Sequence, residues 1–119
     1  MTDELPLLDT AALAELRASV GDDDAFVHEL AAAYLAEGPN DLAALAAAAA
    51  AGDAGGTVRP AHTLKSSSAA LGAARLAALC RQVEYAGREG RVATPEEVAT
   101  VKSTWDATVG AMQEAGLTG

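Results

Sequence analysis

Apolar residues recur at helical spacing along almost the whole chain of 119 residues. Leucine, valine and alanine lie three or four positions apart, and Gly, Pro and Asp interrupt the pattern between successive stretches. We therefore expect helices at about residues 9–20, 23–51, 57–71, 73–89 and 95–115. Because the connections are short, the fold class predicted is all-α, an antiparallel four-helix bundle with a short additional N-terminal helix.

Capping residues mark several of the predicted helix ends. Asp9 can cap the first helix, and Thr57 is expected to cap the third, which places Pro60 in a first turn where its missing N–H does no harm. Thr94 precedes a proline and has Glu97 three positions later, the pattern of a capping box. These signals support the helix count.

The large side chains fall on the apolar stripes. Phe26, Tyr34, Trp105 and Met112 are predicted to fill the core of one domain spanning residues 1–119. The single cysteine, Cys80, lies on the same kind of stripe, so we predict a buried small hydrophobe that forms no internal disulfide.

The net charge of -9 is distributed unevenly. Residues 1–53 hold 11 acidic and one basic side chain, whereas residues 54–119 hold 6 acidic and 7 basic ones. Nucleic acids and anionic membranes need clustered cations, so neither is expected as a partner. No apolar run is long enough to cross a bilayer and no secretory signal precedes it, which indicates a cytoplasmic protein.

One segment combines a lone histidine with a lysine one turn later. On a helix, His62, Lys65, Ser66 and Ala69 share one face, and Leu64 lies roughly opposite. The histidine is therefore predicted to point outward. Small neighbours leave room for a partner, and the lysine can neutralise an anion carried on the ring, of which a phosphoryl group is the natural example.

A chain reversal at the next glycine brings further polar residues to this face. If the chain turns near Gly72, residues 82–84 lie level with His62, and Arg88 falls a turn further, near Arg59. Positive charge is then expected on several sides of the histidine.

This segment resembles the histidine-containing phosphotransfer (HPt) domains of phosphorelays, whose motif runs His-x-Leu-Lys-Gly-x-[Ser/Ala], followed by Gly, Leu, Cys and Leu-Glu. The matching positions are His62, Leu64, Lys65, Ser68, Gly72, Leu76, Cys80 and Glu84. The resemblance covers most of the chain. One departure is Ser66, which stands where the family has glycine and adds bulk where a partner would press.

The resemblance implies that Nε2 of His62 accepts a phosphoryl group from the aspartate of a receiver domain and passes it to another receiver. Those receivers belong to response regulators or hybrid sensor kinases and supply the Mg²⁺, so the chain is expected to need no cofactor of its own. Lys65 would face the phosphate, while Glu84 would orient the ring or pair with Arg88. We expect the exposed docking positions to be Arg59, Thr63, Ser66, Ala69 and Ala70.

Other functions fit the residues less well. The two histidines lie 34 positions apart with no paired ligand spacing, so no metal site is expected, and His28 is given no function. A hydrolase pairing of His62 with Ser66 lacks a nucleophile elbow. No nucleotide-binding glycine motif supports ATP-dependent kinase activity.

The main competing class is a non-catalytic helical adaptor or dimerisation module that binds a receiver or kinase without transfer. A histidine that is merely solvated on a structural bundle would also lack this chemistry. We expect a monomer, and Met1 with the compact ends favours a free-standing carrier.

Overall fold

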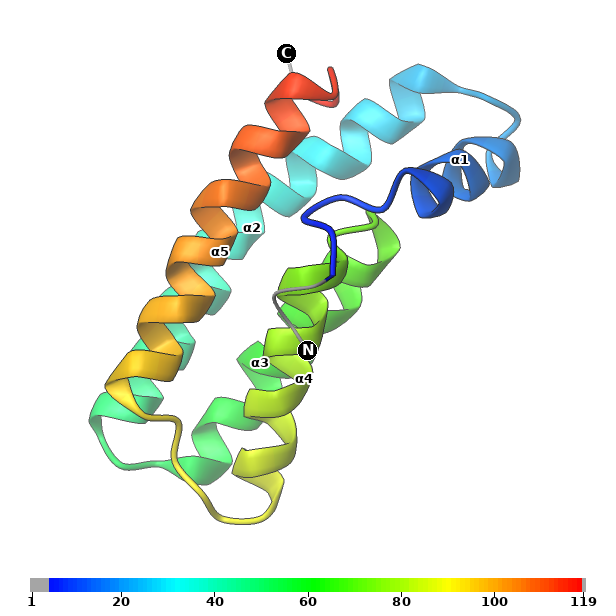
Figure 1. The fold of residues 1–119 in the computed structure, drawn as a ribbon. Helices are drawn as coiled ribbons and strands as arrows, with labels where there is room; N and C mark the ends of the chain where they lie inside the picture. The colour runs from blue at the N-terminus through cyan, green and yellow to red at the C-terminus, as the bar shows by residue number, and fades with distance from the viewer. Residues whose placement is uncertain (1–4, 119) are drawn as a thin grey trace.

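The computed structural model describes residues 5–118, and within them every regular element is a helix (Figure 1). The helices are α1 (Thr10–Ser19), α2 (Asp24–Ala50), α3 (Ala54–Ala70), α4 (Ala74–Arg88) and α5 (Pro95–Glu114). The predicted all-α class is confirmed. Residues 1–4 and 119, the ends of the predicted domain, lie outside the described residues.

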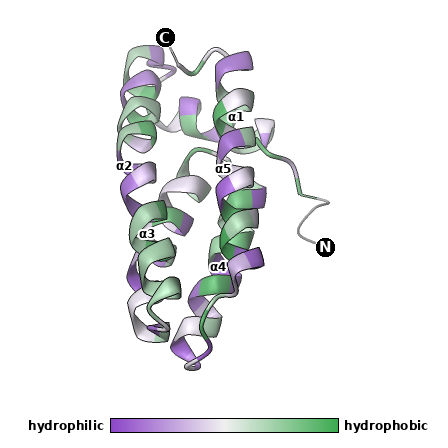
Figure 2. Cartoon of the chain, turned by 90° about the vertical axis from the view of Figure 1, so that its left-hand side faces the viewer, coloured by the Kyte–Doolittle hydropathy of each residue, from purple (hydrophilic) through white to green (hydrophobic). Residues whose placement is uncertain are grey.

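The four long helices pack in a ring. α3 contacts α2 and α4, and α5 contacts the same two helices from the other side, so α3 and α5 lie diagonally across from each other. Hydrophobic and hydrophilic residues alternate along the helices (Figure 2), as expected of helices buried on one side. No described helix is long and apolar enough to span a membrane.

The short helix α1 extends from one end of the molecule and contacts α2. The segment before it lies against the turn between α3 and α4. The amide of Asp9 donates to the carbonyl of Gly72 at 2.7 Å, and the amide of Arg75 donates to the carbonyl of Pro6 at 3.0 Å. Gly72 has a φ of 78°, a conformation that favours glycine, so this turn is where α3 can reverse into α4.

Two of the predicted caps are present. The Asp9 carboxylate accepts from two backbone amides at the start of α1, and Thr94 and Glu97 form the reciprocal capping box of α5. The expected start of α3 at Thr57 is wrong.

Asp53 caps α3 instead, because its carboxylate accepts from the amide of Gly56 at 2.9 Å. The helix therefore begins at Ala54, and Pro60 occupies its seventh position rather than its first turn. Thr57 is buried inside the helix, where its hydroxyl donates to the Ala54 carbonyl at 2.6 Å. A Cβ at Gly56 would collide with the capping carboxylate, so the glycine permits the cap.

The core contains most of the predicted large side chains. Tyr34, Trp105 and Met112 are buried, and the rings of Tyr34 and Trp105 have centroids 4.9 Å apart. Cys80 is 0 % exposed, as predicted, and burial raises the pKa of its thiol to about 12. The assignment of Phe26 to the core is wrong: it is 41 % exposed, because Val27 occupies the inward position in the first turns of α2.

Candidate functional site

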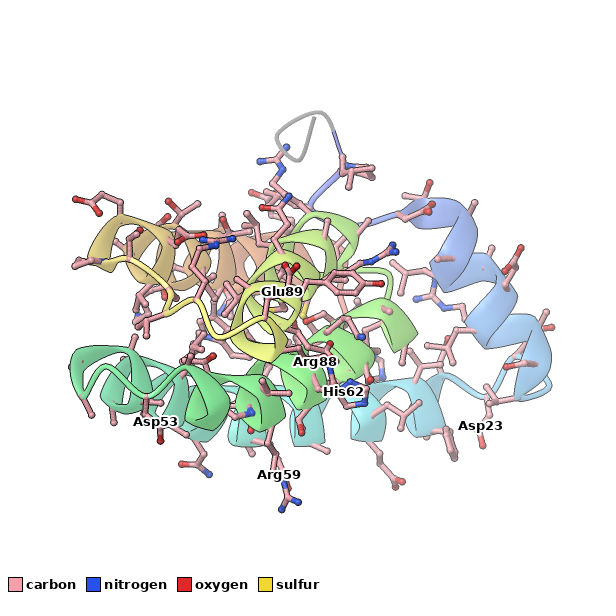
Figure 3. All side chains as sticks on the ribbon, turned by 90° about the horizontal axis from the view of Figure 1, so that it is seen from below. Asp23, Asp53, Arg59, His62, Arg88 and Glu89 are labelled. Atoms are coloured by element: carbon pink, nitrogen blue, oxygen red, sulfur yellow. The ribbon has the colours of Figure 1, made fainter. Side chains whose placement is uncertain are left out.

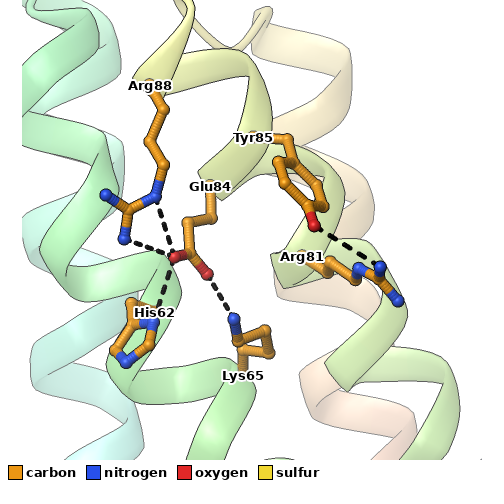
Figure 4. A network of polar contacts seen from close by, with 6 residues as sticks. All are labelled: His62, Lys65, Arg81, Glu84, Tyr85 and Arg88. Carbon is orange, nitrogen blue, oxygen red and sulfur yellow. Dashed lines mark hydrogen bonds and ion pairs between the residues drawn. The ribbon is translucent and has the colours of Figure 1, made fainter.

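The candidate site is centred on His62, in the middle of α3. Its side chain is 53 % exposed, while Leu64 two positions later is fully buried. The Nδ1 atom lies 3.0 Å from Oε2 of Glu84 on α4 (Figure 4). An ionised carboxylate only accepts hydrogen bonds, so Nδ1 carries the ring proton and donates it. In the neutral ring the other nitrogen, Nε2, then keeps its lone pair.

Glu84 is held by three side chains at once. Lys65 forms an ion pair with Oε1 at 2.7 Å, and Arg88 donates to Oε2 from Nη2 at 2.7 Å and from Nε at 3.1 Å. With His62 as the third partner, the Glu84 side chain is only 6 % exposed. A buried charge needs such partners.

These contacts determine the ionisation of the carboxyl group. The pKa of Glu84 is lowered to about 2, and the contact with Lys65 contributes most to this shift. Arg88 and His62 lower the pKa further, and the three contacts together outweigh burial, which raises it. Glu84 is therefore ionised at any physiological pH, and it always accepts the Nδ1 proton.

The local fold explains this arrangement. α3 and α4 form a hairpin through the turn at Gly72, which places Glu84 level with His62 as the sequence predicts. The two helices approach closely at Gly87, where a Cβ would collide with Thr57. Close helix packing of this kind brings a short glutamate side chain within reach of the neighbouring helix.

The positive charges are arranged differently from the expectation. Lys65 and Arg88 both contact Glu84, so in this structure Lys65 pairs with a carboxylate rather than standing free for a phosphate. Arg59 is exposed but does not join them, because its side chain extends away from His62 and Arg88 (Figure 3). Two cations and one anion thus surround the histidine.

The surface beside the histidine is formed by small residues. The expected docking positions Thr63, Ser66, Ala69 and Ala70 are all exposed. A shallow groove of about 310 Å³ between α2 and α3 adjoins them, with Thr63 and Ala70 on one wall and Leu30 on the other. Because Ser66 points to solvent, its hydroxyl does not disturb the core.

Ser68 lies in the core, unlike the exposed Ser66. It is fully buried, and its hydroxyl lies 2.7 Å from that of Tyr34, so the two are hydrogen-bonded between α3 and α2. The spacing contains the signal, since Ser68 lies four positions after the inward Leu64 and three before the inward Leu71.

Sequence reasoning missed a pair of residues on α4. The guanidinium carbon of Arg81 lies 5.3 Å from the centroid of the Tyr85 ring, and its Nη2 atom lies 3.5 Å from the phenol oxygen. Tyr85 directly follows Glu84 and is 55 % exposed. The i,i+4 spacing of an arginine and a tyrosine next to Glu84 is the signal that could have revealed them.

The second histidine lies elsewhere and has a structural contact. The Nε2–H group of His28 donates to the carbonyl of Gly116 at 2.7 Å and so links the start of α2 to the end of α5. Within residues 5–118, no group of three or more His, Cys, Asp or Glu side chains is arranged to hold a metal ion.

Comparisons with known proteins agree with this geometry. The family model of the Hpt domain matches residues 29–115. In the search of solved structures, the chain is similar to the crystal structure of histidine-containing phosphotransfer protein B from Pseudomonas aeruginosa PAO1. The TM-score is 0.79 and the sequence identity 25%, over 92% of this chain and 94% of the other. The sequence search of curated proteins finds no match.

Proposed function

Because the chain belongs to the Hpt domain family, we propose that it carries a phosphoryl group on His62 from the aspartate of one receiver domain to that of another. The observation that carries the proposal is the contact between Nδ1 and Glu84. It leaves the lone pair of Nε2 available on an exposed face lined by small residues.

In the proposed reaction, Nε2 attacks the phosphorus of the aspartyl phosphate in line with the leaving carboxylate oxygen. The N–P bond forms while the P–O bond breaks, and the receiver's aspartate leaves with the electron pair. The ring keeps its Nδ1 proton throughout, and Glu84 stabilises the positive charge that develops on the imidazole. The return step is the reverse, onto another receiver.

The receiver contributes the Mg²⁺ and the acidic pocket in this scheme, and the chain contributes a positioned nucleophile. Most of the catalysis is therefore alignment and electrostatics. We propose that the chain is a carrier and not an autonomous ATP-dependent kinase.

Two further residues support the phosphorylated state. A phosphoryl group carries close to two negative charges, and Lys65 and Arg88 lie on either side of the Glu84 carboxylate beside the ring. Both cations can share their donors between Glu84 and the phosphoryl oxygens, since an ammonium has three N–H donors and a guanidinium five. We therefore propose supporting roles for Lys65 and Arg88 in the phosphorylated state.

The scaffold we propose is an antiparallel four-helix bundle of α2–α5 with α1 attached, in one domain spanning residues 1–119. The ring of contacts among the long helices supports it. A monomer in the cytoplasm is proposed to meet receivers through the exposed face of α3. Its docking positions are Arg59, Thr63, Ser66, Ala69 and Ala70.

The decisive experiment offers receiver domains phosphorylated on aspartate to the chain and measures acid-labile label on it. The wild type and a His28→Gln variant are expected to take up label, whereas His62→Gln takes up none. His28 is the matched control because it is the other histidine of the chain and is hydrogen-bonded at the far end of α2. A non-catalytic adaptor would bind the receiver without any label on the wild type, and that outcome would overturn the proposal.

A further inference from the structure

We propose that Arg81 and Tyr85 form a second edge of the docking surface, on α4, that contacts an acidic part of the receiver domain. The inference rests on the proposed function and adds to it the residues that determine which receivers dock well. The pair lies on α4, whereas the small residues of the docking surface lie on α3.

The pair has the chemistry of an interface. Tyr85 is 55 % exposed, and the guanidinium of Arg81 stacks against its ring. Tyrosine and arginine are enriched at the centres of protein interfaces, where a stacked arginine presents a pre-ordered cation. A contact between two exposed side chains on one helix adds under about 1 kcal/mol to stability, so folding does not account for the pair.

The charge of Arg81 is available to a partner. Within residues 5–118, no carboxylate forms an ion pair with Arg81, whose contacts are with the neutral phenol of Tyr85. In contrast, Lys65 and Arg88 are paired with Glu84. In a chain with a net charge of -9, Arg81 is thus an uncompensated cation close to the reactive histidine. An acidic receiver surface complements it.

The position of the pair fits a receiver seated on His62. Arg81 and Tyr85 flank Glu84 on the outer side of α4, and Figure 4 shows them beyond Lys65 as seen from His62. Lys65 also lines the shallow cleft that the pair borders, together with Ala78. A standard interface covers about 800 Å² of each partner, a disc of about 16 Å radius. Neighbouring helices lie about 8–10 Å apart, so such a disc centred on α3 includes α4.

The test compares two phosphodonors on the same variants. Arg81→Glu and Tyr85→Ala are labelled with phosphoramidate, which needs no docking surface, and by a phosphorylated receiver that labels the wild type. Lys102→Glu is the matched control: it makes the same charge change on α5, which lies diagonally across from α3. Within residues 5–118, the carboxylate that forms an ion pair with Lys102 is that of its neighbour Asp106.

We expect both α4 variants to raise the KM for the phosphorylated receiver about fivefold or more, with phosphoramidate labelling within twofold of wild type and Lys102→Glu unchanged. The effect of Arg81→Glu is expected to shrink at high salt. The inference is overturned if receiver transfer is unaffected, if Lys102→Glu behaves like Arg81→Glu, or if phosphoramidate labelling falls in parallel. If phosphoramidate labels the wild type but no phosphorylated receiver does, the proposed function itself is overturned.

Discussion

Removing the Glu84 side chain tests how the protein sets the tautomer of the His62 ring on which the proposed transfer depends. The carboxylate accepts the Nδ1 proton of His62 at 3.0 Å, and its pKa of about 2 keeps it ionised. In Glu84→Ala the ring has no acceptor on that side, so the proton is free to move to Nε2. That tautomer has no lone pair on the outward nitrogen and cannot attack phosphorus.

The size of the effect follows from the strength of the hydrogen bond. A bond to a charged group is worth about 1.5–3 kcal/mol, and because the ring is half exposed we take the lower end. About 1.4 kcal/mol corresponds to tenfold in an equilibrium. The share of the reactive tautomer is therefore expected to fall by up to about tenfold, and the rate of labelling with it.

The assay combines ¹⁵N NMR of the ring with phosphoramidate labelling. The spectrum is recorded well above the range in which imidazole titrates, so that it reports the tautomer of the neutral ring. Labelling is measured at saturating donor, because Lys65 and Arg88 are released by the mutation and would otherwise attract the anionic donor. Glu89→Ala is the control, since it removes an exposed glutamate at the end of the same helix.

A Glu84→Ala protein whose ring keeps its proton on Nδ1, and which is labelled at the wild-type rate, would refute this reasoning. Glu84→Gln separates charge from geometry. Its amide oxygen can still accept from Nδ1, so the tautomer is expected to be largely kept, although the two cations lose their counter-charge.

Three further predictions concern stability, each measured as the free energy of unfolding in denaturant. Gly38→Ala is expected to lose about 1–3 kcal/mol, because a Cβ there would lie within 3.0 Å of three atoms of the Trp105 ring. In its control Gly110→Ala, the new Cβ meets no atom within 4 Å, so this variant should gain about 0.5–1 kcal/mol. The pKa of Glu84 is about 2 in the folded protein against an ordinary 4.5, so its ionised form stabilises the fold above pH 4.5, and this contribution disappears as the pH falls toward 2. Glu84→Gln should remove that part of the acid dependence of the free energy of unfolding. Tyr34→Phe and Ser68→Ala should each cost about 1–3 kcal/mol by leaving a buried hydroxyl unpaired, and the double variant less than their sum.

The centre of the site could be predicted because it depends on regular geometry. The outward direction of His62 follows from helical periodicity, and the position of Glu84 follows from a hairpin that turns at Gly72. Both arguments need only the rise and rotation of an α-helix. The partner of Lys65 could not be predicted in this way, because it depends on side-chain rotamers that meet between two helices.

The start of α3 was missed because two capping residues compete within a few positions. Asp53 and Thr57 are both good caps, and their local signals do not differ enough to choose between them. Packing decides: with no side chain at Gly87, α4 approaches α3 closely, and Thr57 is buried against it inside the helix. Spacing within α3 predicts that Ser68 points inward but not its hydrogen-bond partner, because the hydroxyl of Tyr34 comes from α2.

The buried position of Cys80 makes its thiol a probe for the opening of the helix bundle. It is the single thiol of the chain, it is shielded from solvent, and its pKa of about 12 leaves almost no thiolate at neutral pH. Since alkylating reagents attack the thiolate, modification requires the helices to separate first. The rate of alkylation therefore reports how often the helices separate in the native protein, with no label added and no residue near His62 altered.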